Sequence, residues 1–293
     1  MLLLLLAVII LDTTVPAQTR DVQYQADLAP RNIMATFDRG YLIVYDRDET
    51  LDVYARDGAR LYSVSAKAPA ASSTRMLNAA VDEDGTLAVT VDYTRPNHTG
   101  GGIALFDRTG AQIRFFDTGE YLPGQICYAP DHSIWTLGHP VIRTDNVSKD
   151  YKILRNYSQD GRELGAFLSR SSFATSNRAE LGGPMIGGWL LRVANGRVGA
   201  QIDQRRWWVE TGLNGKEIGR WNIGSGGHLG FTQDGNLYGQ NNHDGSIRVF
   251  DRSTGVWRPL STPMPDGYLL GADGNNLVFE MKGGSILRWV PAP

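Results

Sequence analysis

The chain contains a single cysteine, Cys127, so no disulfide can form within it. It also lacks an excess of basic residues, since 29 lysines and arginines stand against 31 acidic residues. This balance provides no positive field for nucleic acid and no polybasic patch for an anionic membrane. No long stretch of helical periodicity is present. The 34 glycines and the many short apolar runs instead indicate strands joined by tight turns.

The N-terminus has the features of a secretory signal. Residues 1–17 contain the apolar run Leu2–Leu11, which is too short to span a bilayer. The sequence Val15-Pro16-Ala17 places small residues at the −3 and −1 positions of a cleavage site before Gln18. We therefore expect a signal peptide over 1–17, a mature chain over 18–293 with no membrane span, and a secreted or periplasmic protein. No basic residue precedes the apolar run, which leaves a retained N-terminal anchor as the alternative.

A repeated turn pattern runs through the rest of the chain. Turns of a first set are each followed by a β-rich run, and they read DRG (38–40), EDG (83–85), PDH (130–132), ANG (194–196), QDG (233–235) and ADG (272–274). Turns of a second set are flanked by apolar/polar alternation, and they read RDG (56–58), RTG (108–110), QDG (159–161), LNG (213–215) and STG (253–255). Asp-Gly and Asn-Gly between such runs predict β-hairpins, because these residues accommodate positive φ. Each unit therefore has four strands, named A to D in chain order, with tight A–B and C–D turns.

The first set has six turns and the second has five, and this difference predicts how the fold closes. The last unit ends at 285–293 with a third strand, and the β-like segment 21–28 (DVQYQADL) is not assigned to any unit. We expect this segment to supply the missing strand, because a ring closed in this way has no exposed sheet edge. The predicted fold is all-β: a six-bladed β-propeller of four-stranded antiparallel blades, closed by an N-terminal strand that completes the last blade.

The units DGSIRVFDRSTGVW (244–257) and GGIALFDRTGAQI (101–113) share a Phe-Asp-Arg turn. This style of unit resembles the NHL-repeat and related six-bladed propellers of secreted bacterial proteins, over residues 21–293. The resemblance implies the fold, and the family includes binding modules, calcium-dependent lactonases and lyases. Its calcium ligands lie in Pro-Asn-Gly and Pro-Asp-Gly sequences where A strands begin, and only Pro265-Asp266-Gly267 matches here. We expect no resident cofactor, with calcium at Asp266 as the alternative.

The connections between strands predict which face of the ring is functional. The A–B and C–D turns share one face, which we name the tight-turn face, and the B–C and D–A connections share the other, the loop face. Three connections on the loop face are long, at 92–102, 139–150 and 169–183. Loops of this length without structure of their own are often functional. We therefore expect the ligand site on the loop face of blades 2 to 4 and at the mouth of the central channel.

The candidate ligand-binding residues come from the strand ends and from the loops. Registering the strands on their turns gives Asn78, Gln125, Trp189, His228 and Asn242, and the loops add Arg95, His98, Arg143, Arg205, Arg206 and His243. Arg205 and Arg206 stand next to two tryptophans, a composition that suits clamping of an anionic or sugar ligand. The alternative is that Trp207 and Trp208 pack into neighbouring layers while the arginines form a short loop.

Two functional hypotheses follow. The favoured one is a binding module that recognises a protein, peptide or carbohydrate through its loop face and channel mouth. The other is a lyase or hydrolase, including a metal-dependent lactonase-like enzyme, with His228 or His139 as general acid/base at the channel mouth. An enzyme would gather at least two titratable groups around one pocket, whereas a binding module would present exposed aromatic and arginine side chains. No G-x-S-x-G motif is present and Cys127 falls within a predicted strand, so acyl chemistry has no support.

Overall fold

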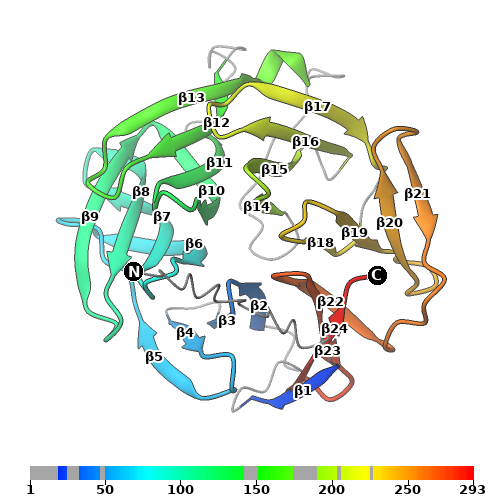
Figure 1. Ribbon diagram of the computed structural model, residues 1–293. Helices are drawn as coiled ribbons and strands as arrows, with labels where there is room; N and C mark the ends of the chain where they lie inside the picture. The colour runs from blue at the N-terminus through cyan, green and yellow to red at the C-terminus, as the bar shows by residue number, and fades with distance from the viewer. Residues whose placement is uncertain are drawn as a thin grey trace, which may run out of the picture.

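The computed structural model describes residues 19–24, 33–46, 50–141, 151–173, 190–202, 206–224 and 227–293. These residues form six four-stranded antiparallel sheets arranged as blades around a central axis (Figure 1). The six-bladed β-propeller predicted from the sequence is therefore confirmed. Helix is limited, within the described ranges, to the 3₁₀ turn η1 (Arg170–Ser172), and none of these ranges contains a helix of the length and apolarity needed to cross a membrane.

The blades follow one another along the chain, each running from the innermost strand to the outermost. Blades 1 to 3 consist of β2 (Ile33–Asp38), β3 (Tyr41–Asp46), β4 (Leu51–Tyr54) and β5 (Arg60–Val64); β6 (Ser73–Val81), β7 (Leu87–Arg95), β8 (His98–Phe106) and β9 (Gln112–Gly119); and β10 (Tyr121–Tyr128), β11 (Ile134–Pro140), β12 (Lys152–Tyr157) and β13 (Glu163–Ser169). Blades 4 to 6 consist of β14 (Leu191–Ala194), β15 (Arg197–Ile202), β16 (Trp207–Gly212) and β17 (Glu217–Asn222); β18 (Leu229–Phe231), β19 (Leu237–Gln240), β20 (Ile247–Asp251) and β21 (Val256–Pro259); and β22 (Gly267–Asp273), β23 (Asn276–Met281), β24 (Ile286–Pro291) and β1 (Arg20–Gln23).

The strand β1 closes the ring. It pairs antiparallel with β24, with Val22 opposite Leu287, and Figure 1 shows the blue first strand beside the red last one. Val22 is buried in a cluster that includes Trp289, whereas Asp21 accepts two hydrogen bonds of 2.6 Å from the partly exposed guanidinium of Arg288. The first strand of the chain thus completes its last blade, as the turn count predicted. Residues 25–28 of the predicted closing segment lie outside the described residues.

The turns identified in the sequence connect the strands that they were predicted to connect. Glycine is required in them because the backbone takes positive φ, as at Gly58 (φ +89°). Gly58 has a second constraint, since a Cβ there would lie 2.1 Å from the carbonyl oxygen of Gln23. The C–D turn of blade 1 therefore rests directly against the closing strand, a contact possible only for glycine.

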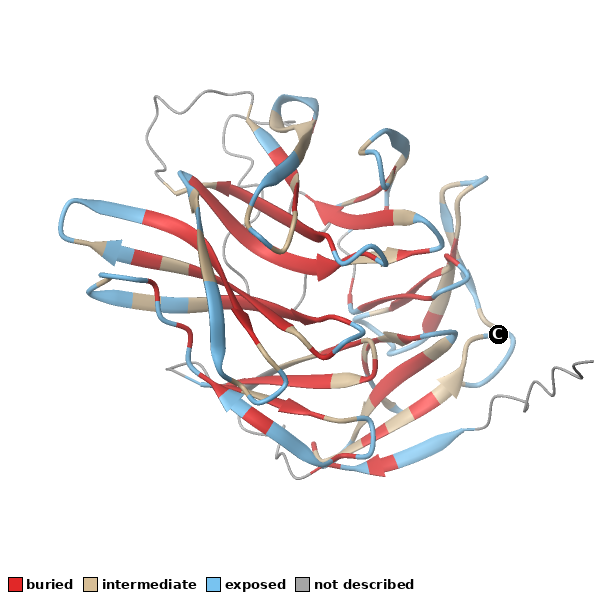
Figure 2. Ribbon diagram, turned by 60° about the vertical axis from the view of Figure 1, so that its left-hand side comes forward, coloured by how far each residue is buried: buried red, intermediate tan, exposed pale blue. Residues whose placement is uncertain are grey.

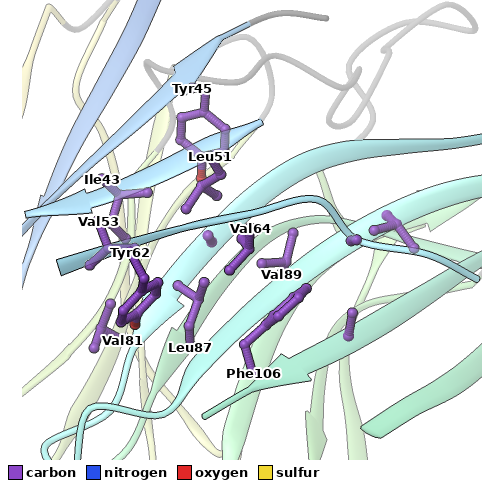
Figure 3. Close-up of a cluster of buried hydrophobic side chains, with 14 of the residues drawn as sticks. Ile43, Tyr45, Leu51, Val53, Tyr62, Val64, Val81, Leu87, Val89 and Phe106 are labelled. Atoms are coloured by element: carbon purple, nitrogen blue, oxygen red, sulfur yellow. The ribbon is translucent and has the colours of Figure 1, made fainter. Parts of the chain in front are cut away.

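Buried side chains from facing sheets fill the space between neighbouring blades. Figure 3 shows the cluster between blades 1 and 2, where Ile43 and Val53 meet Val89 and Phe106, none of them more than 2% exposed. Figure 2 shows the same distribution over the whole ring, with burial along the strands and exposure at the turns. Cys127 lies in the cluster between blades 3 and 4, where burial raises the pKa of its thiol to about 12. It is therefore a small apolar core residue.

The prediction of a long loop at 92–102 is wrong. The strands β7 and β8 continue to Arg95 and His98, so that a two-residue turn joins them and blade 2 carries a long hairpin. The glycines that suggested a loop instead allow aromatic rings to lie on bare backbone. A Cβ on Gly100 would come 2.5 Å from the hydroxyl oxygen of Tyr93, and one on Gly102 would come 2.4 Å from the Phe115 ring. Of the other two predicted loops, 142–150 and 174–183 lie outside the described residues.

Candidate ligand-binding site

Two of the residues predicted at the channel mouth bond to each other. The Nδ2 atom of Asn78 in β6 donates to Oε1 of Gln125 in β10 across 3.1 Å, and both residues are buried. The register shifts by one residue just before each of them, at a β-bulge in the innermost strand of each blade. The bulges turn both carboxamides toward the junction of blades 2 and 3. There the two amides link neighbouring blades, and this leaves less of their hydrogen-bonding capacity for a ligand.

The two histidines proposed as acid/base candidates occupy different environments in non-adjacent blades. His139 lies in β11 of blade 3, is only 6% exposed, and has its Nδ1 2.8 Å from the carbonyl oxygen of Pro140. His228 is exposed just before β18 in blade 5, and its ring centroid lies 6.2 Å from that of Tyr268. The Tyr268 side chain is itself 63% exposed. His228 and Tyr268 therefore form an exposed pair of rings on the loop face, where blades 5 and 6 meet.

The metal candidate Asp266 forms an ion pair with Lys282, and both side chains are largely exposed. The hydrogen bond from Lys282 and the opposite charge of Asp266 raise the pKa of the lysine. Among the residues that the structure describes, no group of three or more His, Cys, Asp or Glu side chains is arranged to hold a metal ion. Calcium binding at Asp266 stays the alternative hypothesis.

Arg95 and His98 pair across the turn of the blade 2 hairpin. The guanidinium of Arg95 lies 4.4 Å from the centre of the Tyr93 ring and 3.3 Å from an oxygen of Asp117. The Tyr93 hydroxyl donates to the same carboxylate, and burial together with this acid raises its pKa to about 12. The ring of His98 lies 6.1 Å from that of Tyr93. These contacts fasten the hairpin tip, with Arg95 and His98 at its end.

Arg206 is exposed, and its carbonyl oxygen accepts a 2.7 Å hydrogen bond from the amide of Ile223. The neighbouring tryptophans divide between two packing layers. Trp208 is fully buried between blades 4 and 5, and Trp207 packs against the cluster between blades 3 and 4. The two tryptophans therefore pack into neighbouring layers, as the alternative expected, and a role of the arginines in binding a ligand stays a prediction. The candidates Arg143, Trp189 and Arg205 lie outside the described residues.

A pocket of about 200 Å³ opens on the loop face at blade 5. It lies between the connection that enters from blade 4 and the turn that joins β19 to β20. Two predicted residues, Asn242 and His243, line it, and Gly227 places it next to His228. The other lining side chains that matter for its chemistry are Ile223, Leu229, Trp257, Gln240, Asn241 and Arg248.

The apolar part of the pocket is held in place by one tryptophan. The Nε1 atom of Trp257 donates to the carbonyl oxygen of Ile223 across 3.1 Å, and its ring meets Phe250 edge to face at 5.1 Å. A Cβ on Gly239 would lie 2.8 Å from the indole, so the ring covers bare backbone. With the buried side chain of Leu229, the indole gives the pocket an apolar floor in a fixed position.

The polar part of the pocket contains two kinds of side chain. The carboxamide of Gln240 accepts from the amide of Leu269 (3.0 Å) and donates to the carbonyl oxygen of Gly267 (2.7 Å), so it joins blade 5 to blade 6. By contrast, the side chains of Asn242 and His243 make no hydrogen bond within the described part of the chain. Their donors and acceptors surround an apolar floor, an arrangement typical of ligand sites.

Sequence reasoning found Asn242 and His243 but missed Arg248, Trp257 and Asn241. Arg248 and Trp257 lie inside strands, where a sequence gives no indication of which side chain reaches a pocket. The run Asn241-Asn242-His243-Asp244-Gly245 was the available signal, because it is a B–C connection rich in amide side chains.

The fold and this site define a six-bladed β-propeller with a small, polar-rimmed pocket on its loop face. No family model matches the chain, and no curated protein matches it. Among solved structures, it is similar to a protein of unknown function from Bacteroides caccae, with 16% identity over 78% of this chain and 80% of that one and a TM-score of 0.47. It is also similar to the PQQ-bound form of an aldose sugar dehydrogenase from Streptomyces coelicolor, with 15% identity over 94% and 98% of the two chains and a TM-score of 0.47. Likeness at this level carries no information about activity.

Proposed function

We propose that this propeller is a carbohydrate-binding module that holds one sugar unit in the blade 5 pocket. The observation that carries the proposal is the pairing of a fixed indole with side chains of Asn242 and His243 that have no hydrogen-bond partner in the described chain. A carboxamide both donates and accepts, so it matches a sugar hydroxyl, which does the same. The indole and Leu229 offer the apolar surface on which the carbon side of a sugar ring can rest.

The size of the pocket supports a single ring as its occupant. Its volume of about 200 Å³ is smaller than that of sites for drug-sized ligands, which span roughly 300–1,000 Å³. A longer saccharide would place one end unit here and continue over the loop face. His228 and Tyr268 are the exposed rings next along that face, adjacent to Gly227 at the rim.

We also propose that the module is an NHL-like propeller that is exported to the periplasm or the exterior. The repeated Phe-Asp-Arg turns and the cleavage-type sequence before Gln18 support this proposal. The test is the intact mass of protein recovered from the exported fraction of expressing cells. A mass that corresponds to residues 18–293 supports export with cleavage. A membrane-bound protein whose mass includes residues 1–17 supports a retained N-terminal anchor instead.

Saturation-transfer NMR with purified protein tests the proposed function. The probes are D-glucose, D-galactose, D-glucuronate and D-galacturonate, with short peptides as the competing ligand class. Asn242→Trp places bulk at the pocket mouth and is expected to abolish the saccharide signal. Asn97→Trp is the matched control, because Asn97 is also exposed on the loop face but lies at the blade 2 hairpin. Signal from peptides alone, or saccharide signal that survives in Asn242→Trp, overturns the proposal.

A further inference from the structure

We propose that the sugar held in the blade 5 pocket is acidic and that Arg248 recognises its carboxylate. This inference rests on the proposed function and names the ligand class of the same site. The ligand would be a uronic acid, or a saccharide that ends in one, with its ring on the Trp257 indole and its carboxylate at the guanidinium.

The charge of the pocket is the first observation behind this inference. The chain contains 31 acidic residues and has a net charge of −2, yet the described residues lining the pocket include no carboxylate. The lining does include one permanently charged group, the guanidinium of Arg248. This cation is only 37% exposed and lies beside apolar surface. Partial removal from water strengthens its attraction for an anion, compared with an arginine on the open surface.

The position of Arg248 is the second observation. It lies in β20, paired with Gly239 of β19 on one side and with Pro259 of β21 on the other, so its backbone is fixed within the sheet. Within the described ranges its ion-pair partner is Asp244, whose Oδ2 is 3.5 Å from the guanidinium. The other oxygen of Asp244 accepts from the amide and the hydroxyl of Ser246. Asp244 therefore serves mainly to stabilise its own turn.

The long contact with Asp244 leaves Arg248 able to bind a ligand. An ion pair at this distance between partly exposed side chains contributes little. A guanidinium has five N–H donors and can hold a carboxylate through two parallel hydrogen bonds. A carboxylate at the pocket mouth would thus form a better-aligned pair than the one already present, without displacing Asp244 from its turn.

The rest of the lining favours a sugar acid over other small anions. A free amino acid would bring an ammonium group, and the described lining offers no carboxylate to receive it. A phosphate monoester carries a charge of about −1.5 to −2, which a single guanidinium does not neutralise. A uronic acid has one negative charge for Arg248 and several hydroxyls for Asn242 and His243. It also has an apolar ring face for Trp257.

Isothermal titration calorimetry with matched acidic and neutral sugars tests the inference. We expect the wild-type protein to bind D-glucuronate or D-galacturonate at least ten times more tightly than D-glucose or D-galactose. Arg248→Gln should remove this preference, so that acidic and neutral sugars bind with affinities within about twofold of each other. Arg248→Lys keeps the charge without the planar fork, and it should keep only part of the preference. The preference should also shrink as salt is raised from about 0.05 to 0.5 M.

The control and the opposing outcomes separate this inference from the proposed function. Arg114→Gln removes the same charge from an exposed position on the outermost strand of blade 2 and should leave the preference intact. Equal wild-type affinity for acidic and neutral sugars, or a preference that survives in Arg248→Gln, overturns the acidic class and leaves the carbohydrate pocket standing. Tighter binding of glucose 6-phosphate than of either uronate also overturns it. Absence of binding to every sugar overturns the proposed function itself. Thermal melts of the variants establish that each one folds.

Discussion

Single arginines in the C–D turns of blades 5 and 1 connect each blade to the one before it. Arg252 in blade 5 donates from Nε to an oxygen of Glu210 in blade 4 across 2.7 Å. Glu210 is fully buried and also accepts from Nε1 of Trp208 at 2.8 Å. The equivalent residue of blade 1, Arg56, reaches Asp273 of blade 6 at 2.5 Å. At this turn position the arginine is therefore an inter-blade clasp in blades 5 and 1.

The aspartate of the same motif stabilises the turn itself. One oxygen of Asp251 accepts from the amide of Ser253 at 2.9 Å and from its hydroxyl at 2.6 Å. These hydrogen bonds favour the ionised form and lower the pKa of Asp251 to about 2. Asp107 in blade 2 accepts from Thr109 in the same way. In both units the aspartate shapes the turn, and in blade 5 the arginine that follows it holds the preceding blade.

Replacement of Glu210 by alanine tests the clasp. The change leaves Arg252 and the Trp208 indole without their acceptor, and we expect a loss of about 2–4 kcal/mol in the free energy of unfolding. Glu217→Ala is the control, because Glu217 pairs with Arg220 on the exposed outermost strand and should cost less than about 1 kcal/mol. Urea denaturation provides both values. Equal losses for the two variants would contradict the clasp.

Gly58 and Gly119 form a matched pair for the contact at the closing strand. Both have positive φ, at +89° and +65°, but a Cβ at Gly119 would meet nothing within 4 Å, whereas one at Gly58 would meet the Gln23 carbonyl. Gly119→Ala should therefore cost only the left-handed backbone penalty, about 1–2 kcal/mol. Gly58→Ala should cost at least about twice as much, because the closing strand must also move. The comparison is made by thermal melting, and similar shifts for both variants would argue against the contact.

At the scale of elements, β1 determines whether the ring is closed. Its buried and exposed faces contribute differently to the stability of the fold. Val22→Asp puts a charge into the cluster around Trp289 and should cost about 3 kcal/mol or more. Asp21→Asn removes only the exposed pair with Arg288 and should cost less than about 1 kcal/mol. Size-exclusion chromatography of Val22→Asp should also show association, since the unpaired edge of β24 becomes available. A monomer of wild-type stability would contradict closure by β1.

The turn between β10 and β11 forms another junction between blades, and we expect its stability to depend on pH. Nδ1 of His132 lies 2.8 Å from the fully buried carboxylate of Asp82 in blade 2, to which Arg39 of blade 1 and Gln159 of blade 3 also bond. The hydrogen bond and the charge of Asp82 raise the pKa of His132, with further contributions from Asp84 and Glu83. The protonated form of the histidine is therefore favoured in the folded protein.

The sign of the effect on stability follows from this raised pKa. The contribution of His132 is fully present below its ordinary pKa of about 6.5 and is lost as the pH rises through the raised value. His132→Asn keeps a residue that tolerates the observed φ of +63° but does not titrate. The difference in free energy of unfolding between the wild type and this variant, measured with denaturant, should be larger at about pH 5.5 than at about pH 9. A difference in stability that does not change with pH would exclude a pH-dependent ion pair between His132 and Asp82.

At the scale of the whole molecule, the ring combines contributions that no single blade contains. The pocket takes its floor from blade 5 and Ile223 from the connection that follows blade 4, while Gln240 fixes its wall to blade 6. A ligand that binds only the closed ring must raise the melting temperature of the entire domain by mass action. The same measurement separates the sugar-binding proposal from the metal alternative.

For the metal alternative, we predict that millimolar calcium leaves the melting temperature unchanged. Asp266 is paired with Lys282, and its side chain is open to water, so it offers a divalent cation one carboxylate already matched by a charge. D-galacturonate should raise the melting temperature under the same conditions, and EDTA should have no effect. A calcium-dependent rise that EDTA reverses would instead favour the metal-dependent enzyme.

The sequence alone determined the architecture, because local chemistry controls hairpins. Asp-Gly and Asn-Gly turns impose their backbone geometry wherever they occur, and counting them gave six blades and a strand exchanged between the termini. Local signals failed where side chains from distant strands meet. Gly100–Gly102 suggested a loop because a sequence does not show that Tyr93 and Phe115 lie over those glycines. Arg248 and Trp257 could not be placed at the pocket because a sequence does not show which face of β20 and β21 borders Asn242 and His243, and the pairing of the strands within blade 5 decides this.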